Sequence, residues 1–294
     1  MTPLIIEARI NEYAMRDINP HVPWTADEIA ETAVRCREAG ASILHYHARR
    51  PDGGPENAVE ANAEIIAKVR ARCDILIHPT LGFVANDADP ASRIDTIIAL
   101  AADPATKPDF APLDTGSANV ELYDPVTRRF SHADRIYENR TDTLIAHAGE
   151  LKRLGIKPIL VSWAVGFTRR AFALVDAGLV GEPVYLLFHM TDGVFLTGHP
   201  GTEAGLDAHL AFLPSDRSVH WTANVLGGNL LALADTIIRR GGNLSIGIGD
   251  YPYGELGAPP NEDVIRRAAG IAHAAGRPVA DVAETKRLLR LAAD

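Results

Sequence analysis

The sequence predicts a (β/α)8 TIM barrel, on three observations. Short apolar runs alternate with longer amphipathic segments eight times along the chain, and this order implies parallel strands joined by helices. The chain has 294 residues, which is usual for such a barrel and long for one ordinary domain. No low-complexity linker divides the chain, so we expect one barrel domain over residues 1–294, with an extra C-terminal helix at 281–292.

The first two elements show the pattern clearly. The apolar run LIIEARIN at 4–11 is predicted to be the first strand. The segment TADEIAETAVRCREAG at 25–40 is predicted to be a helix, because Thr25 and Glu28 have the spacing of a capping box. Gly40 is expected to end this helix, since glycine is the commonest residue just past a helix C-terminus.

The other seven strands are predicted from apolar runs of the same kind, at 41–47, 74–80, 109–115, 157–163, 182–190, 218–224 and 243–249. The other helices are predicted at 57–72, 91–102, 133–155, 169–178, 203–213, 229–242 and 262–275. Residues 116–132 are rich in loop residues and are predicted to form no regular element. In barrels of this type the active site lies at the C-terminal ends of the strands.

Composition excludes several classes of function. The net charge is -9 and no run of basic residues is present, which argues against a nucleic-acid-binding protein. No apolar stretch reaches the roughly 18 residues that a membrane span needs. The first residues lack the basic start of a signal peptide, and Cys36 and Cys73 do not suggest a disulfide framework. We therefore expect a cytoplasmic protein that binds neither membranes nor nucleic acid.

Two histidines mark the end of the second predicted strand. Side chains alternate along a strand, so His45 and His47 share one face, while Leu44 and Tyr46 on the other face can pack under a helix. Two imidazoles about 7 Å apart along a strand can converge on one metal ion. The alternative is a pair of hydrogen-bonded core histidines, but the position at a barrel strand end favours a metal.

Other predicted strands also end in polar side chains. These are Glu7, Arg9 and Asn11 on the first strand, His78 and Thr80 on the third, Asp114 and Thr115 on the fourth, His189 on the sixth, and Asp250 after the eighth. Together they predict a polar pocket without specifying a reaction. The turn Gly227, Gly228 and Asn229 precedes a helix, where free N–H groups can hold a phosphate or carboxylate. A tight turn with an asparagine cap explains the same residues equally well.

Several stretches together resemble the β-keto acid cleavage enzymes, whose founding activity cleaves 3-keto-5-aminohexanoate. The resemblance rests on PLIIEARIN at the start, ILHYHAR at 43–49, HPTLGF at 78–83, DTGSAN at 114–119, and GGNLSIGIGD near the end. It implies a (β/α)8 barrel with one Zn²⁺ per chain, in a homotetramer. It also implies that a β-keto acid and acetyl-CoA are converted to acetoacetate and a new acyl-CoA.

The resemblance also assigns roles to individual residues. It implies that His45 and His47 bind the zinc, and that Thr80 contacts the substrate. Thr115 and Asn119 fall in the strand-four loop that meets substrate in the family. Asp250 matches the aspartate that helps to activate the substrate for carbon–carbon bond formation. Arg9, on one face of the first predicted strand, and Asn229, in the turn after the seventh, are added as substrate-binding candidates.

The chain departs from the family at strand eight, where the family reads approximately Arg-x-Gly-x-Glu-Asp and this chain reads SIGIGD. The zinc-binding glutamate becomes Gly249 and the arginine becomes Ser245, and the acidic strand-five motif becomes VSWAVG. Catalytic zinc usually takes three protein ligands. The candidates for the third ligand are Glu7, His78 and His189, each at the inner end of a different predicted strand.

Two other functions remain open at this point. The first is a metal-dependent hydrolase of a lactone or amide. Such barrels also use a His-x-His pair, together with a more distant histidine and an aspartate on strand eight, and His189 and Asp250 would fill these two places. Against it, the two histidines lie on the second strand, and no lysine ends the fourth. The second is a barrel that binds a small molecule and has lost catalysis. The replacement of the family's arginine by Ser245 and of its glutamate by Gly249 favours this alternative.

Overall fold

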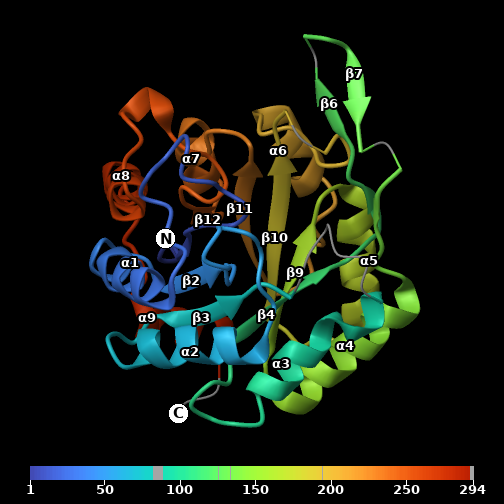
Figure 1. Ribbon diagram of the computed structural model, residues 1–294. Coiled ribbons are helices and arrows are strands. Elements are labelled where there is room, and N and C mark those ends of the chain that lie inside the picture. Colours follow the sequence, from blue (N-terminus) through green and yellow to red (C-terminus); the bar gives the residue numbers. More distant parts are fainter. Residues whose placement is uncertain (82–88, 125, 133, 194, 292–294) are drawn as a thin grey trace.

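Eight parallel strands lie side by side in one sheet that curls into a nearly closed barrel (Figure 1). The computed structural model describes residues 1–81, 89–124, 126–132, 134–193 and 195–291. The strands are β1 (Ile6–Arg9), β2 (Ile43–Tyr46), β3 (Leu76–Pro79), β4 (Phe110–Asp114), β9 (Lys157–Ser162), β10 (Val184–Thr191), β11 (Val219–Leu226) and β12 (Asn243–Ile246). Their order is β3-β2-β1-β12-β11-β10-β9-β4. The backbone N–H of Asp109 donates to the carbonyl of Ile77 at 3.1 Å, between the two edge strands. The predicted (β/α)8 barrel is therefore confirmed.

The helices cover the outside of the barrel (Figure 1). They are α1 (Ala26–Glu38), α2 (Val59–Arg70), α3 (Asp95–Leu100), α4 (Thr141–Leu154), α5 (Val165–Asp176), α6 (Glu203–Leu210), α7 (Leu231–Arg239), α8 (Asn261–Ala274) and α9 (Val282–Leu289). Short 3-10 helices occupy Pro90–Ile94 and Gly254–Leu256. At the start of α1, Thr25 and Glu28 form the predicted capping box, and Gly40 follows its C-cap with φ +113°.

The predicted helix at 133–155 is wrong at its start. Residue 133 lies outside the described residues, and α4 begins only at Thr141. Before it, β8 (Ile136–Tyr137) pairs with β5 (Ala118–Asn119), so a long-range pairing overrides local helix propensity.

The segment predicted to be loop also contains regular structure. Strands β6 (Leu122–Asp124) and β7 (Arg129–Ser131) form a hairpin that projects from the barrel (Figure 1). At the other end of the chain, α9 replaces the longer helix predicted at 281–292. It stops where Arg290 adopts a left-handed conformation, and residue 292 is outside the described part.

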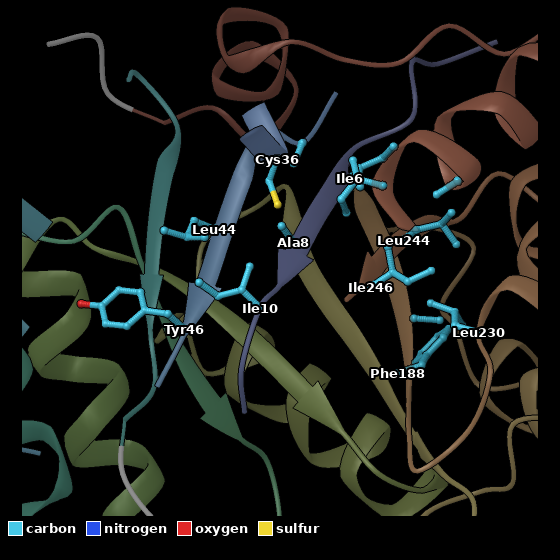
Figure 2. Close-up of a cluster of buried hydrophobic side chains, with 14 of the residues drawn as sticks. Ile6, Ala8, Ile10, Cys36, Leu44, Tyr46, Phe188, Leu230, Leu244 and Ile246 are labelled. Atoms are coloured by element: carbon cyan, nitrogen blue, oxygen red, sulfur yellow. The ribbon is translucent and has the colours of Figure 1, made fainter. Parts of the chain in front are cut away.

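Alternation along the strands sorts side chains between two environments. Ile6, Ala8 and Ile10 of the first strand segment point outward into a buried apolar layer, as do Leu44 and Tyr46 (Figure 2). Residues of α1 belong to the same layer. Burial of this layer holds the helices against the sheet, at about 25 cal/mol per Å² of apolar surface removed from water. The residues between them on these strands therefore face the barrel interior.

The length and hydropathy of the helices bear on whether any could span a membrane. Within the described ranges, none is both long enough and apolar enough to cross a bilayer.

Close approach of the strand ends depends on a glycine. A Cβ built on Gly247, just after β12, would lie 2.0 Å from the backbone oxygen of Arg9. By contrast, a Cβ on Gly270 in α8 would meet nothing within 4 Å. The barrel therefore tolerates a side chain at one of these glycines and not at the other.

We predict opposite effects of the same substitution at these two sites. Gly247→Ala forces the backbone of two strands apart and should cost at least about 1–3 kcal/mol, lowering the melting temperature by several degrees. Gly270→Ala should leave the melting temperature unchanged or raise it, because alanine is the better helix former. Thermal unfolding followed by circular dichroism measures both, and equal melting temperatures for the two variants would contradict the packing described.

Candidate active site

Strand register brings the polar strand ends together. Arg9 on β1 lies beside His45 on β2, which lies beside His78 on β3. On the other side of β1, Glu7 lies beside Ser245 on β12. A cavity of about 80 Å³ opens among these strand ends, and we call it the histidine cavity. Its polar wall includes Arg9, Glu12, His45, His47, His78 and His189.

The centre of this wall is a carboxylate that the sequence did not single out. Glu12 Oε1 lies 3.2 Å from Nε2 of His45, and Glu12 Oε2 lies 2.9 Å from Nε2 of His47. All three side chains are buried. One ligand atom from each lies within 4.8 Å of the others, so the three could hold a metal ion. The spacing is close to the roughly 3.3 Å between neighbouring ligands of a tetrahedral zinc.

Hydrogen bonding at His45 supports a cation between these groups. Nδ1 of His45 lies 2.9 Å from the carbonyl oxygen of His78, which can only accept, so Nδ1 carries the proton. Burial lowers the pKa of His45 to about 4, and the ring is therefore neutral near pH 7. Its Nε2 then presents a lone pair to Glu12 Oε1, an oxygen with no hydrogen bond within the described structure. Two facing lone pairs repel unless a cation lies between them.

Arg9 balances the charge of Glu12. Nη2 of Arg9 lies 2.9 Å from Glu12 Oε2, and both side chains are buried. Burial by itself would raise the pKa of Glu12, but the charges of Arg9 and the two histidines hold it well below its usual value. Glu12 is therefore ionised, as a metal ligand must be.

Gly249 provides the space that Glu12 occupies. A Cβ on Gly249 would lie 2.8 Å from Cγ of Glu12 and 2.7 Å from the backbone nitrogen of Asn11. The position at which the resemblance expects a glutamate is thus empty of side chain, and a glutamate from the end of the first strand lies against it. Glu12 has φ +32°, so it does not continue the alternation of β1. An acid directly after a predicted strand end was the only signal in the sequence.

A chain of hydrogen bonds runs from Arg9 across three further strands. Arg9 Nε and Asn224 Nδ2 both donate to Oδ2 of Asp250, at 2.8 and 2.9 Å. The Oδ1 of Asn224 lies 3.0 Å from Nδ1 of His189. Oδ1 of Asp250 is buried and has no hydrogen-bond partner in the described ranges.

The environment makes Asp250 a stronger base than an ordinary aspartate. Burial, together with the nearby charge of Glu12, raises its pKa to about 6, although Arg9 and Asn224 oppose the shift. A carboxylate with a pKa near 6 is well suited to proton transfer near neutral pH.

Two of the predicted third ligands are partners of each other. Nδ1 of His78 lies 2.5 Å from Oε1 of Glu7, and Ser245 Oγ donates to Oε2 of Glu7 at 2.6 Å. Burial would raise the pKa of Glu7, but His78 beside it holds the value at about 2. Glu7 and His78 can form a metal-binding group with His45, as an alternative to the group that contains Glu12.

Other predicted site residues are divided between the cavity and the scaffold. Thr80 and His189 line the histidine cavity. Asn11 positions His47, because its side-chain oxygen accepts from the backbone N–H of His47 and its amide donates to the carbonyl of the same residue. Thr115 is buried, with its hydroxyl within hydrogen-bond distance of the carbonyls of Val161 and Phe167.

The remaining two candidates do not line the histidine cavity. Asn119 is exposed on β5. Asn229 caps the turn before α7, because its Oδ1 accepts from the N–H of Leu231. Gly227 donates its N–H to the carbonyl of Asp250. These contacts favour the tight turn with an asparagine cap over an anion site. The geometry gives Thr115, Asn119 and Asn229 no contact with the histidine cavity.

A second cavity adjoins the first. It has a volume of about 480 Å³ and a largely apolar lining, and we call it the apolar cavity. Tyr13, Phe195 and Leu226 line both cavities. Asp250 lines the apolar cavity, while its partner Arg9 lines the histidine cavity. Asp250 therefore lies at the boundary between the two.

Comparison with solved structures shows the same fold. ObcA in its apo form superposes with a TM-score of 0.73 at 15% identity, over 92% of this chain and 66% of the ObcA chain. A type I 3-dehydroquinate dehydratase from Clostridium difficile superposes with a TM-score of 0.56 at 9% identity. At these identities the likeness concerns the barrel alone.

Sequence comparison is more specific. The 3-keto-5-aminohexanoate cleavage enzyme of Acetoanaerobium sticklandii is 28% identical over 98% of both chains. The 3-dehydrocarnitine:acetyl-CoA trimethylamine transferase of Rhizobium meliloti is 26% identical over 92% of this chain and 90% of its own. The sequence model of the beta-keto acid cleavage enzymes matches residues 3–291. The chain therefore belongs to the beta-keto acid cleavage enzyme family and is an enzyme of that type.

Proposed function

We propose that the protein is a zinc-dependent β-keto acid cleavage enzyme that converts a β-keto acid and acetyl-CoA to acetoacetate and a new acyl-CoA. The observation that carries this proposal is the buried group of Glu12, His45 and His47, with Asp250 beside it through Arg9. The names of relatives that use acetyl-CoA support the choice of co-substrate.

The zinc would be held by His45, His47 and Glu12. Glu12 would thus take the place of the third ligand for which Glu7, His78 and His189 were the candidates from the sequence. Two imidazole nitrogens and one carboxylate are a usual ligand set for catalytic zinc, which keeps a fourth position for water or substrate. When bound there, the ion would polarise the keto oxygen of the substrate. Glu7 and His78 then serve as a supporting pair behind His45, since the carbonyl of His78 fixes the proton on the His45 ring.

Asp250 would remove a proton from the carbon between the keto and carboxyl groups of the substrate. Its Oδ2 is held by Arg9 and Asn224, which leaves Oδ1 to take the proton. Arg9 is the single arginine or lysine among the described residues that line the histidine cavity, so it would steady the negative charge of the substrate. Thr80 lines the same cavity and is a further substrate contact.

The bond changes then follow in order. The carbon nucleophile attacks the acetyl carbonyl of acetyl-CoA, a carbon–carbon bond forms, and the CoA thiolate leaves. The thiolate attacks the keto carbon that came from the substrate. The bond between this keto carbon and the carbon that Asp250 deprotonated then breaks. The products are a new acyl-CoA and the carbanion of acetoacetate, which takes back the proton from Asp250.

Acetyl-CoA would enter through the apolar cavity. The pantetheine arm is long and largely apolar, and this cavity has a matching lining that meets the histidine cavity at Tyr13, Phe195 and Leu226. Asp250 at the boundary would then face both reacting carbons.

Dependence of acetoacetate formation on acetyl-CoA separates this function from hydrolysis of a lactone or amide, which needs no CoA. We also expect a cytoplasmic homotetramer from the family resemblance, and sedimentation analysis tests the oligomer.

The first prediction concerns the zinc ligands. Protein purified without added zinc should contain about one zinc per chain, and His45→Ala with His47→Ala should abolish it. Glu12→Gln keeps the shape but removes the charge, and should weaken zinc binding by more than roughly 100-fold, because it removes a ligand itself. Elemental analysis and competition with a chelator give both results without any assay of activity.

Glu7→Gln is the matched control, since Glu7 is also a buried glutamate near His45. It should keep stoichiometric zinc, even if its lost contacts with His78 and Ser245 lower the melting temperature. Zinc retained in Glu12→Gln and lost in Glu7→Gln would place the metal at the alternative group.

The second prediction concerns Asp250. Asp250→Asn should bind zinc normally but lose turnover by roughly two to four orders of magnitude, the usual span for a lost acid–base group. Asp263→Asn, at a half-buried position at the start of α8 and outside both cavities, should keep full turnover. Acetoacetate release in the presence of acetyl-CoA is the measurement, and near-normal turnover in Asp250→Asn would exclude it as the base.

A further inference from the structure

A further cavity lies at the opposite end of the barrel from the histidine cavity, where the strands begin. It has a volume of about 550 Å³, and we call it the basic cavity. Lys157 is the first residue of β9, while Asp109 and Glu182 shortly precede β4 and β10. All three line the basic cavity, together with Arg290 just after α9. The volume is within the range of about 300–1,000 Å³ that is usual for small-molecule sites.

The lining of the basic cavity carries more positive than negative charge, although the whole chain has a net charge of -9. Its cations are Arg70, Lys107, Lys152, Lys157 and Arg290, and its acids are Asp109 and Glu182. Both acids have partners of their own, since Asp109 accepts from the backbone N–H of Ile77 and Glu182 accepts from that of Ser218. Glu182 also pairs with Arg217, which lies outside the cavity. The cavity therefore attracts anions.

Helix C-termini explain only part of this cluster. The negative end of a helix dipole attracts cations, and Lys152 near the end of α4 donates to the carbonyl of Gly178 at 2.8 Å. Arg70 at the end of α2 donates to the carbonyl of Lys107 at 2.6 Å. The side chains of Lys107, Lys157 and Arg290 form no ion pair within 4 Å and no hydrogen bond among the described residues. These three cations are available to a ligand.

Lys157 is the best placed of the three to hold an anion. Its side chain is half-buried, and burial together with the nearby charge of Arg290 lowers its pKa to about 8. Nζ of Lys107 reaches the same cavity, 3.6 Å from the Cβ position of Gly155 after the end of α4. A half-buried ammonium near a second cation is destabilised unless an anion offsets the two charges.

We propose that the basic cavity binds a small organic phosphate with an aliphatic body. A phosphate monoester carries close to two negative charges near neutral pH and accepts from several donors at once, which suits the three available cations. The cavity also offers apolar side chains to the body of the ligand, namely Leu151, Ile156, Leu179, Val180 and Leu291. None of the described aromatic residues lines it, so a nucleobase has no stacking partner there. The strand starts in barrels are remote from catalysis, so this ligand binds apart from the β-keto acid.

Binding of butyl phosphate tests the proposed ligand class. Inorganic phosphate carries the charge without the body, and butanol carries the body without the charge. Calorimetric titration should give butyl phosphate a dissociation constant at least roughly fivefold lower than that of inorganic phosphate, because its methylene groups are buried with it. Butanol should give no measurable binding. Absence of binding by butyl phosphate at millimolar concentration would overturn the site, and equal affinities for the two phosphates would overturn the aliphatic body.

Two variants with the same change of charge locate the binding. Lys157→Gln should weaken binding of butyl phosphate by roughly 10-fold or more, the span of a lost charged hydrogen bond. Arg153→Gln removes one positive charge from α4 outside the basic cavity, and the affinity should stay unchanged. Equal weakening in the two variants would indicate attraction by overall charge and would overturn the site. His45→Ala with His47→Ala should bind butyl phosphate normally, and loss of binding there would place the phosphate in the histidine cavity instead.

Stability without phosphate gives a second readout. In phosphate-free buffer, Lys157→Gln should melt at a temperature no lower than that of the parent protein, because it removes a half-buried charge near Arg290. Millimolar butyl phosphate should raise the melting temperature of the parent protein more than that of the variant. A lower melting temperature for the variant without phosphate would show that the protein itself stabilises this ammonium, and would contradict its assignment to an anion.

Discussion

One buried carboxylate between two imidazoles holds the strand ends of this barrel in their arrangement. Glu12 faces Nε2 of both His45 and His47, and its charge is matched by Arg9. An ionised group buried in this way is costly unless its partners are complete, and a metal ion bound as proposed would complete them together with the arginine. Arg9 in turn holds Asp250, so the proposed metal ligands and the proposed base are coupled through one guanidinium. The geometry of the cavity follows from this set of contacts.

The barrel could be predicted from local pattern because each strand and helix carries its own periodicity. Apolar runs located all eight strands of the sheet, and alternation within them separated Leu44 and Tyr46 from the histidines that they flank. The prediction failed before α4, where Tyr137 pairs with Ala118 across a hairpin-containing insertion. That pairing joins residues 118 and 137, and the segment 133–155, for which a helix was predicted, contains only one of them.

The site was only partly predictable for the same reason. His45 and His47 follow from strand alternation, but Glu12 lies beyond the end of β1, in a conformation that breaks the alternation. In the sequence, Gly249 stands where the resemblance expects a ligand, while in three dimensions it makes room for the side chain of Glu12, which follows β1. Glu7 and His78 lie on different strands, and only the register shows that each is the other's partner. Loss of a functional group from one strand end can thus be offset by a side chain on the neighbouring strand.

The position of a bound zinc ion tests the proposed ligand set most directly. Crystals of the zinc-loaded protein, measured on both sides of the zinc absorption edge, give the ion's location by anomalous scattering. We expect one strong peak per chain, about 2.0–2.2 Å from Nε2 of His45, Nε2 of His47 and a carboxylate oxygen of Glu12. A peak bound by Glu7 and His78 instead, or Glu12 turned away from the ion, would contradict this ligand set.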